Sequence, residues 1–278
     1  MALNIQKLAS FSDGPTGGNP AGVVICEALP TTDEMQAIAA EVGFSETVFS
    51  MLYDGAWRTR YFSPESEVPF CGHATIALGA ALAKQEGDGE FQLVLNETNI
   101  SVSAEKEGEL IKAALQSPLT ESKQADEVLI NDVLSVFNYN QNDFDASIPC
   151  GFAQAGATHM IVALKDRETL SRMQYDLGEG RKLMNKHGLV TIAFIAKETP
   201  QLFHARNAFA SGGVFEDPAT GAAAAALGGY LRDLNWPHEA TLKIIQGEDM
   251  GMRSIIDVDI PPVKGSSVTV SGIVRSMV

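Results

Sequence analysis

Three titratable side chains in this sequence are candidates for proton-transfer chemistry. Glu46 lies in the apolar segment GFSETVF, His73 lies at the start of GHATIALGAAL, and Asp217 lies in FEDPATG. A strand-like alternation would put Glu46 on one face with Phe44 and Val48, where lost hydration raises the pKa of a carboxyl group. A histidine titrates near neutrality and can carry a second proton. These residue types predict general acid–base catalysis.

Each candidate also has a structural interpretation. Glu46 could point into water at a strand end, and His73 could satisfy backbone groups at a helix start. Asp217, which precedes Pro218, could cap a helix by accepting backbone N–H bonds. Cys71 could be a nucleophile with His73 as its base, but such pairs normally come from separate elements. We therefore interpret Cys71 as a small buried residue.

The sequence spacing does not indicate a metal site or a disulfide framework. No His-x-x-x-His or Cys-x-x-Cys spacing occurs, which are the patterns that structural and catalytic zinc sites often show. The other histidines are scattered at His159, His187, His204 and His238, and the cysteines are Cys26, Cys71 and Cys150. We expect no metal and no other cofactor.

The sequence contains an internal duplication, in which the same order of predicted strands and helices occurs twice. Residues 72–82 and 221–231 are identical at six of eleven positions without a gap, and both are small-residue helices that begin at a glycine. Upstream, each half has a strand, a helix that ends at Gly43 or Gly188, and another strand. We predict a mixed α/β fold of two pseudo-symmetric domains, each a curled sheet around a central helix. The domains would be 1–117, joined by a returning strand at 268–278, and 118–267, in which 117–147 reads as a linker and a short helix.

The two glycine-led helix starts are candidate anion-binding elements. The first N–H groups of a helix have no partner within the helix, and the helix dipole adds to their attraction for an anion. If both helices point into one cleft, Gly72, His73, Gly221 and Ala222 offer backbone donors to a carboxylate or enolate oxygen. Neither G-x-x-x-x-G-K nor G-x-G-x-x-G occurs, so these turns do not predict a nucleotide site.

Composition narrows the classes of partner. The 278 residues carry a formal charge of −15, which opposes binding to nucleic acid or to an anionic membrane surface. The first residues show no basic region followed by an apolar core, and the most apolar run, ATGAAAAALGGYL, is too short to span a bilayer. We expect a cytoplasmic protein.

These segments together resemble the PhzF-like phenazine-biosynthesis proteins, relatives of diaminopimelate epimerase and proline racemase. The matching pieces, in family order, are GGNPAGVV (17–24), GFSETVF (43–49), RYFSPESEVPFCGHAT (60–75), EDPATGAA (216–223) and QGEDMG (246–251). The resemblance implies the diaminopimelate-epimerase-like fold, with the active site in a cleft between the halves. It also implies a cofactor-independent isomerase of a small unsaturated or cyclic carboxylic acid, commonly a homodimer.

The resemblance also implies roles for individual residues. Glu46 would shuttle the proton with His73 and Asp217 around it, and the substrate-binding residues would be Asn19, Ser45, Gly72, Gly221 and Ala222. The related epimerases use two cysteines, whereas this chain has Cys71 near the first position and Asp217 near the second. A two-cysteine racemase is therefore disfavoured.

Two departures from the family pattern leave a second hypothesis open. Ala222 stands where the family often has the serine of DPATGS, and MGMRS replaces MGRPS, which puts Met252 at the arginine position and Arg253 one place later. These changes affect substrate identity more than reaction class. They are also the best support for the alternative, a non-catalytic small-acid binding or partner-regulating protein. A weaker third option is hydrolytic or redox chemistry at Cys71.

Overall fold

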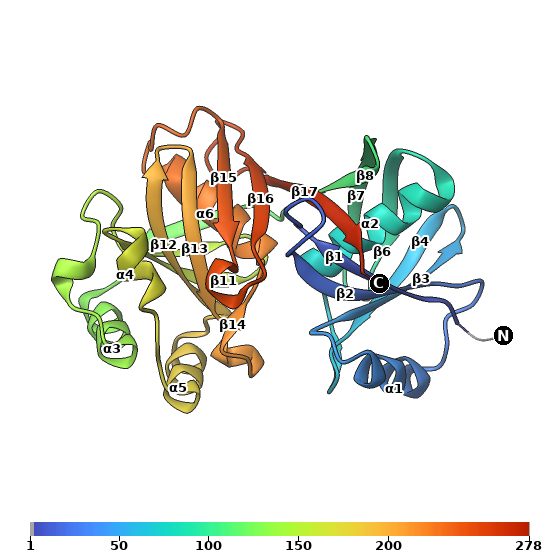
Figure 1. Cartoon of the computed structure of the whole chain (residues 1–278), viewed down its shortest axis with the longest axis horizontal. Helices are drawn as coiled ribbons and strands as arrows, with labels where there is room; N and C mark the ends of the chain where they lie inside the picture. The colour runs from blue at the N-terminus through green and yellow to red at the C-terminus, as the bar shows by residue number, and fades with distance from the viewer. Residues whose placement is uncertain (1–2, 278) are drawn as a thin grey trace. The chain divides into compact units, whose positions relative to one another are not determined.

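The computed structural model describes residues 3–277, and the chain divides into two compact units (Figure 1). The first unit runs to Gln116 and includes the chain from Ser271 onward, and the second is Ser117–Val270. Each unit mixes parallel and antiparallel strands with helices, so the predicted α/β class is confirmed. None of the helices among the described residues is both long and apolar enough to cross a membrane.

The first unit consists of strands with one helix outside and one helix inside the sheet. Its elements are β1 (Ile5–Ser10), β2 (Asn19–Ile25), α1 (Thr32–Val42), β3 (Thr47–Tyr53), β4 (Ala56–Phe62), β5 (Glu67–Val68), α2 (Gly72–Glu86), β6 (Gly89–Val94), β7 (Asn99–Glu107), β8 (Leu110–Gln116) and most of β17 (Thr269–Ser276).

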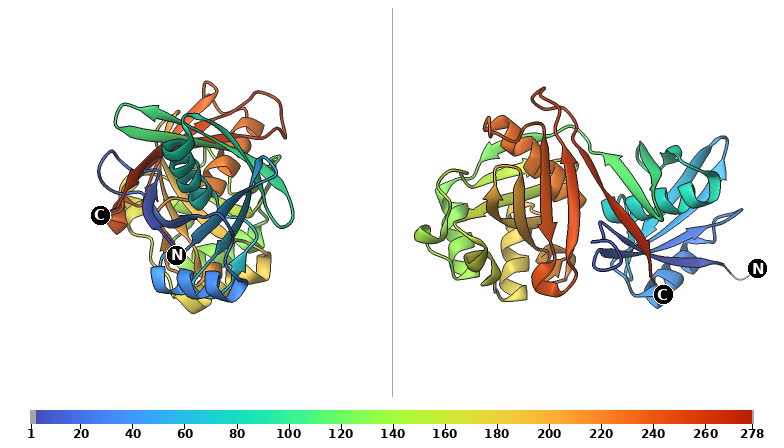
Figure 2. Two further views of the ribbon diagram at one scale, coloured as in Figure 1. Left: turned by 90° about the vertical axis from the view of Figure 1, so that its right-hand side faces the viewer. Right: turned by 45° about the horizontal axis from the view of Figure 1, so that its top comes forward.

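The strands of the first unit pair in a closed order around α2. β1 is antiparallel to β2 and to β17, β2 is parallel to β3, and β3 is antiparallel to β4. β4 is parallel to β6, from which antiparallel pairing continues through β7 to β8, and β8 pairs with β17. Helix α2 contacts six of these strands and is buried from His73 to Ala83 (Figure 2). A helix that is apolar on all sides requires such an enclosure.

Helix α1 covers the outer face of this sheet and sets the path into β3. It begins at a capping box in which Thr31 and Glu34 exchange side-chain to backbone hydrogen bonds. Met35 and Ala39 pack against the apolar cluster on the sheet. The helix ends at Gly43, whose φ of 71° is in the left-handed region that glycine adopts without strain. Residues 44–46 then lead directly into β3.

The second unit repeats the plan with additional short helices. Its elements are β9 (Glu121–Gln124), α3 (Glu127–Phe137), the 3₁₀ turn η1 (Gln141–Asp143), β10 (Gly151–Gln154), β11 (Thr158–Leu164), α4 (Arg167–Ser171), α5 (Leu177–His187), β12 (Thr191–Thr199), β13 (Leu202–Ala208), η2 (Ala210–Gly212), β14 (Glu216–Asp217), α6 (Gly221–Asp233), β15 (Thr241–Gln246), η3 (Glu248–Met250) and β16 (Ser254–Asp259).

Strand directions in the second unit match those in the first. β11 is parallel to β12 with α5 between them in sequence, as β2 and β3 flank α1. β13 is parallel to β15 with β14 and α6 between them, as β4 and β6 flank β5 and α2. Helix α6 contacts β9, β10, β11 and β16 and is largely buried. The duplication read from the sequence is therefore present in the connectivity.

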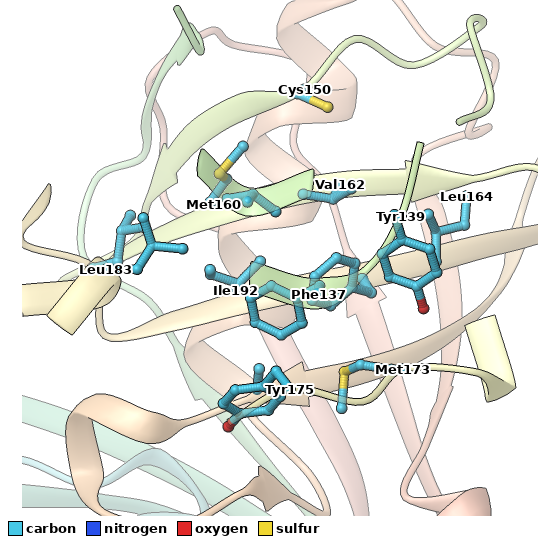
Figure 3. Close-up of a cluster of buried hydrophobic side chains, with 14 of the residues drawn as sticks. Phe137, Tyr139, Cys150, Met160, Val162, Leu164, Met173, Tyr175, Leu183 and Ile192 are labelled. Carbon is cyan, nitrogen blue, oxygen red and sulfur yellow. The ribbon is translucent and has the colours of Figure 1, made fainter. Parts of the chain in front are cut away.

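One sequence expectation in this unit is wrong. The part of 117–147 interpreted as a linker contains β9, which pairs antiparallel with β10. The expected helix is present as α3, capped by Asp126. It packs in an aromatic cluster where the Phe137 ring lies 4.6 Å from that of Tyr175 and 4.7 Å from that of Phe194 (Figure 3). Burial of these rings fixes the segment as part of the second unit's core.

The central helices carry a glycine at the same position, Gly79 in α2 and Gly228 in α6. A Cβ on Gly79 would lie 2.6 Å from Val102 on β7, and one on Gly228 would lie 3.0 Å from Val258 on β16. We expect Gly79→Ala to destabilise the chain by about 1–3 kcal/mol, because the new methyl group would overlap the stiff side chain of Val102. Gly228→Ala should cost less, because its methyl group would lie farther from Val258. Urea unfolding followed by circular dichroism measures both, and equal costs would contradict the packing argument.

A buried histidine makes the stability of the second unit depend on pH. Burial lowers the pKa of His159 from 6.5 to about 4, and its Nδ1 lies 2.8 Å from Thr191 Oγ1. The unfolded chain therefore takes up this proton at a higher pH than the folded chain. The contribution of neutral His159 to the free energy of unfolding is complete above pH 6.5 and falls as the pH drops toward 4. About 2 kcal/mol of unfolding free energy is lost at pH 5.

We predict that His159→Gln removes this part of the pH dependence. The measurement is the difference in unfolding free energy between pH 7.5 and pH 5 for wild type and variant. The wild-type difference should exceed that of the variant by about 2 kcal/mol. Equal differences would show that His159 does not titrate in this window.

Candidate functional site

Four side chains of the first unit converge at the N-terminus of α2. The Glu46 Oε2 atom lies 3.4 Å from His73 Nε2, and Ser45 Oγ also lies 3.4 Å from that nitrogen. The Cys71 Sγ atom lies 3.3 Å from His73 Nδ1 and 4.0 Å from Nε2. His73 is 7% exposed and the Glu46 side chain 15%, so water reaches the carboxylate only in part. The arrangement places a carboxylate, an imidazole and a thiol in one cluster.

Glu46 occupies a different element from the one the sequence indicated. Alternation placed it inside a strand, but β3 begins at Thr47, and 44–46 form the bend between Gly43 and the strand. The carbonyl of Glu46 accepts a hydrogen bond of 3.1 Å from the N–H of Gly22 on β2. This bond fixes the backbone of the bend, while the side chain turns toward the start of α2.

Backbone contacts fix the start of α2. The Ser10 hydroxyl donates to the His73 carbonyl at 2.6 Å, and the Thr75 hydroxyl donates to the Cys71 carbonyl at 2.7 Å. Asn19 is 2% exposed and stands opposite Ser10 in the β1–β2 register. The structure therefore brings Asn19, a predicted substrate-binding residue, to the strand pair that holds His73.

The first turn of α2 is open at its N-terminus. Cys71 is the N-cap residue and has no side-chain capping hydrogen bond, while Thr75 N–H is the donor that closes the first turn on the Cys71 carbonyl. The amides of Gly72 and His73 precede that donor and therefore lie outside the helical bonding pattern. That the Gly72 and His73 amides bind an anionic oxygen stays a prediction.

The thiol–imidazole contact corrects an argument made from sequence. Cys71 and His73 were judged too close in the chain to form a pair, yet Sγ and Nδ1 lie within hydrogen-bond reach. The extended N-cap, with φ −145° and ψ 118°, precedes the helical turn that carries His73 and allows the contact. Cys71 is also buried, as expected.

In the second unit, Asp217 lies close to the start of α6. The Thr220 hydroxyl donates to Asp217 Oδ2, and Asp217 is 8% exposed. The interpretation of Asp217 as a helix cap is wrong, because Thr220 is the N-cap residue. Gly221 and Ala222 are the first two residues of α6, whose N-cap side chain makes no capping bond. Asp217, Gly221 and Ala222 are thus neighbours in this unit.

Gln246 holds this loop and was not found from the sequence. Its side chain is buried, donates to the Asp217 carbonyl at 2.7 Å and accepts from the Thr220 N–H at 3.3 Å. Gln246 is the first residue of the QGEDMG segment, one of the pieces that carry the family resemblance. A buried amide bonded on both sides fixes the loop that presents Asp217.

The acidic residues after Gln246 form an ion-pair network. Glu248 contacts His204 Nδ1 at 2.7 Å and Arg167 at 3.3 Å, and Arg167 also bonds Asp249 at 2.7 Å. Burial alone would raise the pKa of Glu248, but His204 and Arg167 outweigh it and the pKa is lowered. Arg253, displaced by one position from the family pattern, lies 3.4 Å from Glu248.

A second feature missed from the sequence is an arginine–glutamate pair before each central helix. Arg60 bonds Glu67 at 2.6 Å, and Arg206 bonds Glu216 at 2.5 Å. Each glutamate lies five residues before the glycine that begins its central helix. Each glutamate also pairs across the sheet with a strand residue, Phe62 or Ala208, and the arginine lies two residues before that strand residue. The equal spacing of the two glutamates is a signal that the duplication could have revealed.

The predicted site residues fall into two groups. Glu46, Ser45, Gly72 and His73 form one cluster in the first unit, with Asn19 on the adjoining strand pair, and Asp217, Gly221 and Ala222 form another in the second unit. Of the described residues, Glu46, Cys71 and His73 also have potential metal-ligand atoms within 4.8 Å of one another.

Comparison with known proteins identifies the family. The family model "Phenazine biosynthesis-like protein" matches residues 8–275. The chain is 32% identical over 273 residues to an uncharacterized isomerase of Clostridium acetobutylicum, an alignment that covers 92% of this chain and 89% of that protein.

Solved structures agree on the fold. A Bacillus anthracis phenazine biosynthesis protein of the PhzF family is similar with a TM-score of 0.88 at 23% identity, covering 100% of this chain and 98% of that one. A probable proline racemase from Agrobacterium radiobacter has a TM-score of 0.65 at 9% identity, covering 99% and 91%. These likenesses confirm the epimerase-like fold that the resemblance implied. The chain therefore belongs to the phenazine biosynthesis-like protein family, and its enzyme class is isomerase.

Proposed function

We propose that this chain isomerises a small unsaturated or cyclic carboxylic acid by moving a proton, with Glu46 as the general acid and base and without a cofactor. The observation that carries the proposal is the contact of 3.4 Å between Glu46 Oε2 and His73 Nε2 at the open N-terminus of α2. Family membership supports the reaction class. The residue roles are those that the family resemblance implies, and the geometry supports them.

Glu46 is suited to take a proton from carbon and return it elsewhere. Its backbone is fixed by Gly22, and its carboxylate is partly shielded from water but still partly exposed. His73 contacts the carboxylate, Ser45 contacts His73 Nε2 and helps to orient the ring, and the imidazole can carry a second proton. A positioned carboxylate of this kind contributes about 10²–10⁴-fold to the rate.

The first turn of α2 supplies the stabilising donors. Removal of a proton beside a carboxyl or carbonyl group builds negative charge on oxygen, and the amides of Gly72 and His73 at the helix N-terminus attract that charge. Each well-placed donor is worth about 3 kcal/mol in the transition state. Binding and catalysis would thus use the same amides.

Ala222 favours a second candidate function, binding without catalysis. Its methyl group offers no hydroxyl to a ligand, although its backbone N–H remains in the first turn of α6. A protein of this kind would bind small carboxylic acids and leave them unchanged. Calorimetry with a panel of such acids, followed by proton NMR for turnover, separates the two functions, because only the isomerase alters a bound acid.

We predict that Glu46→Gln reduces substrate-dependent deuterium incorporation from D₂O by at least about 100-fold, because the amide cannot accept the proton. Proton NMR of a panel of unsaturated and cyclic carboxylic acids measures the incorporation. Glu41→Gln, on the exposed side of α1, is the matched control and should behave as wild type. Undiminished exchange in Glu46→Gln would remove Glu46 from the mechanism.

The role of Asp217 in the same reaction stays a prediction. We expect Asp217→Asn to slow exchange by about tenfold or more, because the loss of a general acid or base costs about 10²–10⁴-fold and an orienting group less. Asp259→Asn, at an exposed position on β16, is the control for a change of charge in this unit. Wild-type rates in Asp217→Asn with an unchanged circular dichroism spectrum would exclude Asp217.

A further inference from the structure

Glu46, Cys71 and His73 form a set of ligand types that the proposed reaction does not need in full. Proton transfer uses the carboxylate and the imidazole, whereas the thiol of Cys71 has no part in it. Thiolate and imidazole are preferred ligands of zinc, and a carboxylate is a common third ligand. We propose that these three residues bind a thiophilic divalent cation of the Zn²⁺ type and that the bound ion inhibits the enzyme.

The distances fit a tetrahedral ion with small adjustments. Bond lengths of about 2.0–2.3 Å to zinc separate tetrahedral ligand atoms by about 3.3–3.5 Å. Glu46 Oε2 lies 3.4 Å from His73 Nε2, and Cys71 Sγ lies 4.0 Å from the same nitrogen. All three ligand atoms lie within 4.8 Å of one another. A tetrahedral site would require the Cys71 sulfur to come about 0.5 Å closer to His73 Nε2.

The backbone that carries these ligands is held independently of any ion. The carbonyls of Cys71 and His73 accept hydrogen bonds from Thr75 and Ser10. Tyr61 in turn bonds the Thr75 hydroxyl at 2.7 Å, and Tyr61 is 1% exposed. Ligands on a fixed backbone lose little entropy on binding, which favours the ion.

The cluster is accessible to an ion from solvent, and its three side chains leave the fourth coordination position of a tetrahedral ion open. The Glu46 side chain is 15% exposed and Ser45 is exposed, so an ion can reach the cluster from that side. Three protein ligands leave one tetrahedral position for water, as in open zinc sites. Binding replaces the thiol S–H bond with a metal–sulfur bond and releases that proton to solvent, so affinity should rise with pH.

The inhibition rests on the proposed function, whereas the binding does not. A carboxylate bound to a divalent cation no longer accepts a proton from carbon, so occupation of the site removes the general base. Cys71 contributes to the ion site and has no role in the proton transfer. Replacing the thiol therefore separates the two properties.

Cobalt spectroscopy tests the binding without any substrate. Titration of the whole chain with Co²⁺ should produce a thiolate-to-cobalt charge-transfer band in the near ultraviolet, and Zn²⁺ should abolish it by displacement. Cys150→Ser, which changes a buried thiol in the second unit, should keep the band, and Cys71→Ser should lose it. Glu46→Gln should weaken Zn²⁺ binding at least tenfold. No band in wild type, or an equal band in Cys71→Ser, would overturn the site.

The exchange assay tests the inhibition. Zn²⁺ should suppress deuterium incorporation in wild type, and a chelator should restore it. Cys71→Ser should need at least tenfold more Zn²⁺ for half-inhibition, with each variant scaled to its own rate without metal. A cobalt band with no loss of exchange would overturn the inhibition alone. Absence of exchange in metal-free wild type would contradict the proposed function and leave the spectroscopic result to decide the site.

Discussion

The ion pair between an arginine and a glutamate before each central helix is the constraint on which both site clusters depend. Arg206 and Glu216 are 6% and 2% exposed, so each charge would be strongly unfavourable without the other. The pair fixes a two-residue strand against its neighbour, β14 on β13 and, through Arg60 and Glu67, β5 on β4. The chain must then enter each helix five residues later at a fixed place. Breaking one pair would release the helix start and the loop that precedes it.

The same backbone carries different side chains in the two units. In the first unit, Val68 on β5 pairs with Tyr61 on β4. At the equivalent position of the second unit, Asp217 on β14 pairs with Asn207 on β13. Thr191 is the residue of the second unit that corresponds to Glu46 in the first. Its hydroxyl lies 2.8 Å from Nδ1 of the buried His159, and neither group needs a charge for this hydrogen bond. Duplication thus preserved the positions and changed the charges. The acid–imidazole pair belongs to the first unit, and the buried aspartate, held by Gln246, belongs to the second.

The sequence predicted the fold well because the duplication acts on features that are local along the chain. The helices α2 and α6, their glycine starts and the order of strands all follow from periodicity and turn residues. Side-chain partners across elements did not follow. Glu46 was placed in a strand because Val48 and Phe49 extend the apolar pattern backwards, whereas Gly43 delays the strand to Thr47. For Asp217, a catalytic candidate, Asp-Pro also offered a helix cap as the structural alternative, but neither interpretation indicates that Gln246, distant in sequence, shapes that loop.

Sequence spacing does not indicate the proposed ion site, for a related reason. Spacing rules such as His-x-x-x-His describe ligands carried on one helix face, whereas here the ligand types come from a bend before β3 and from the N-cap and second residue of α2. The feature on which the proposed role of Glu46 as a base rests, a fixed carboxylate beside an imidazole with limited water, is also suited to binding a cation. A nearby thiol shifts that preference toward soft metals. Under this proposal, an acid–base site of this composition would be susceptible to zinc, and a site without Cys71 would be less so.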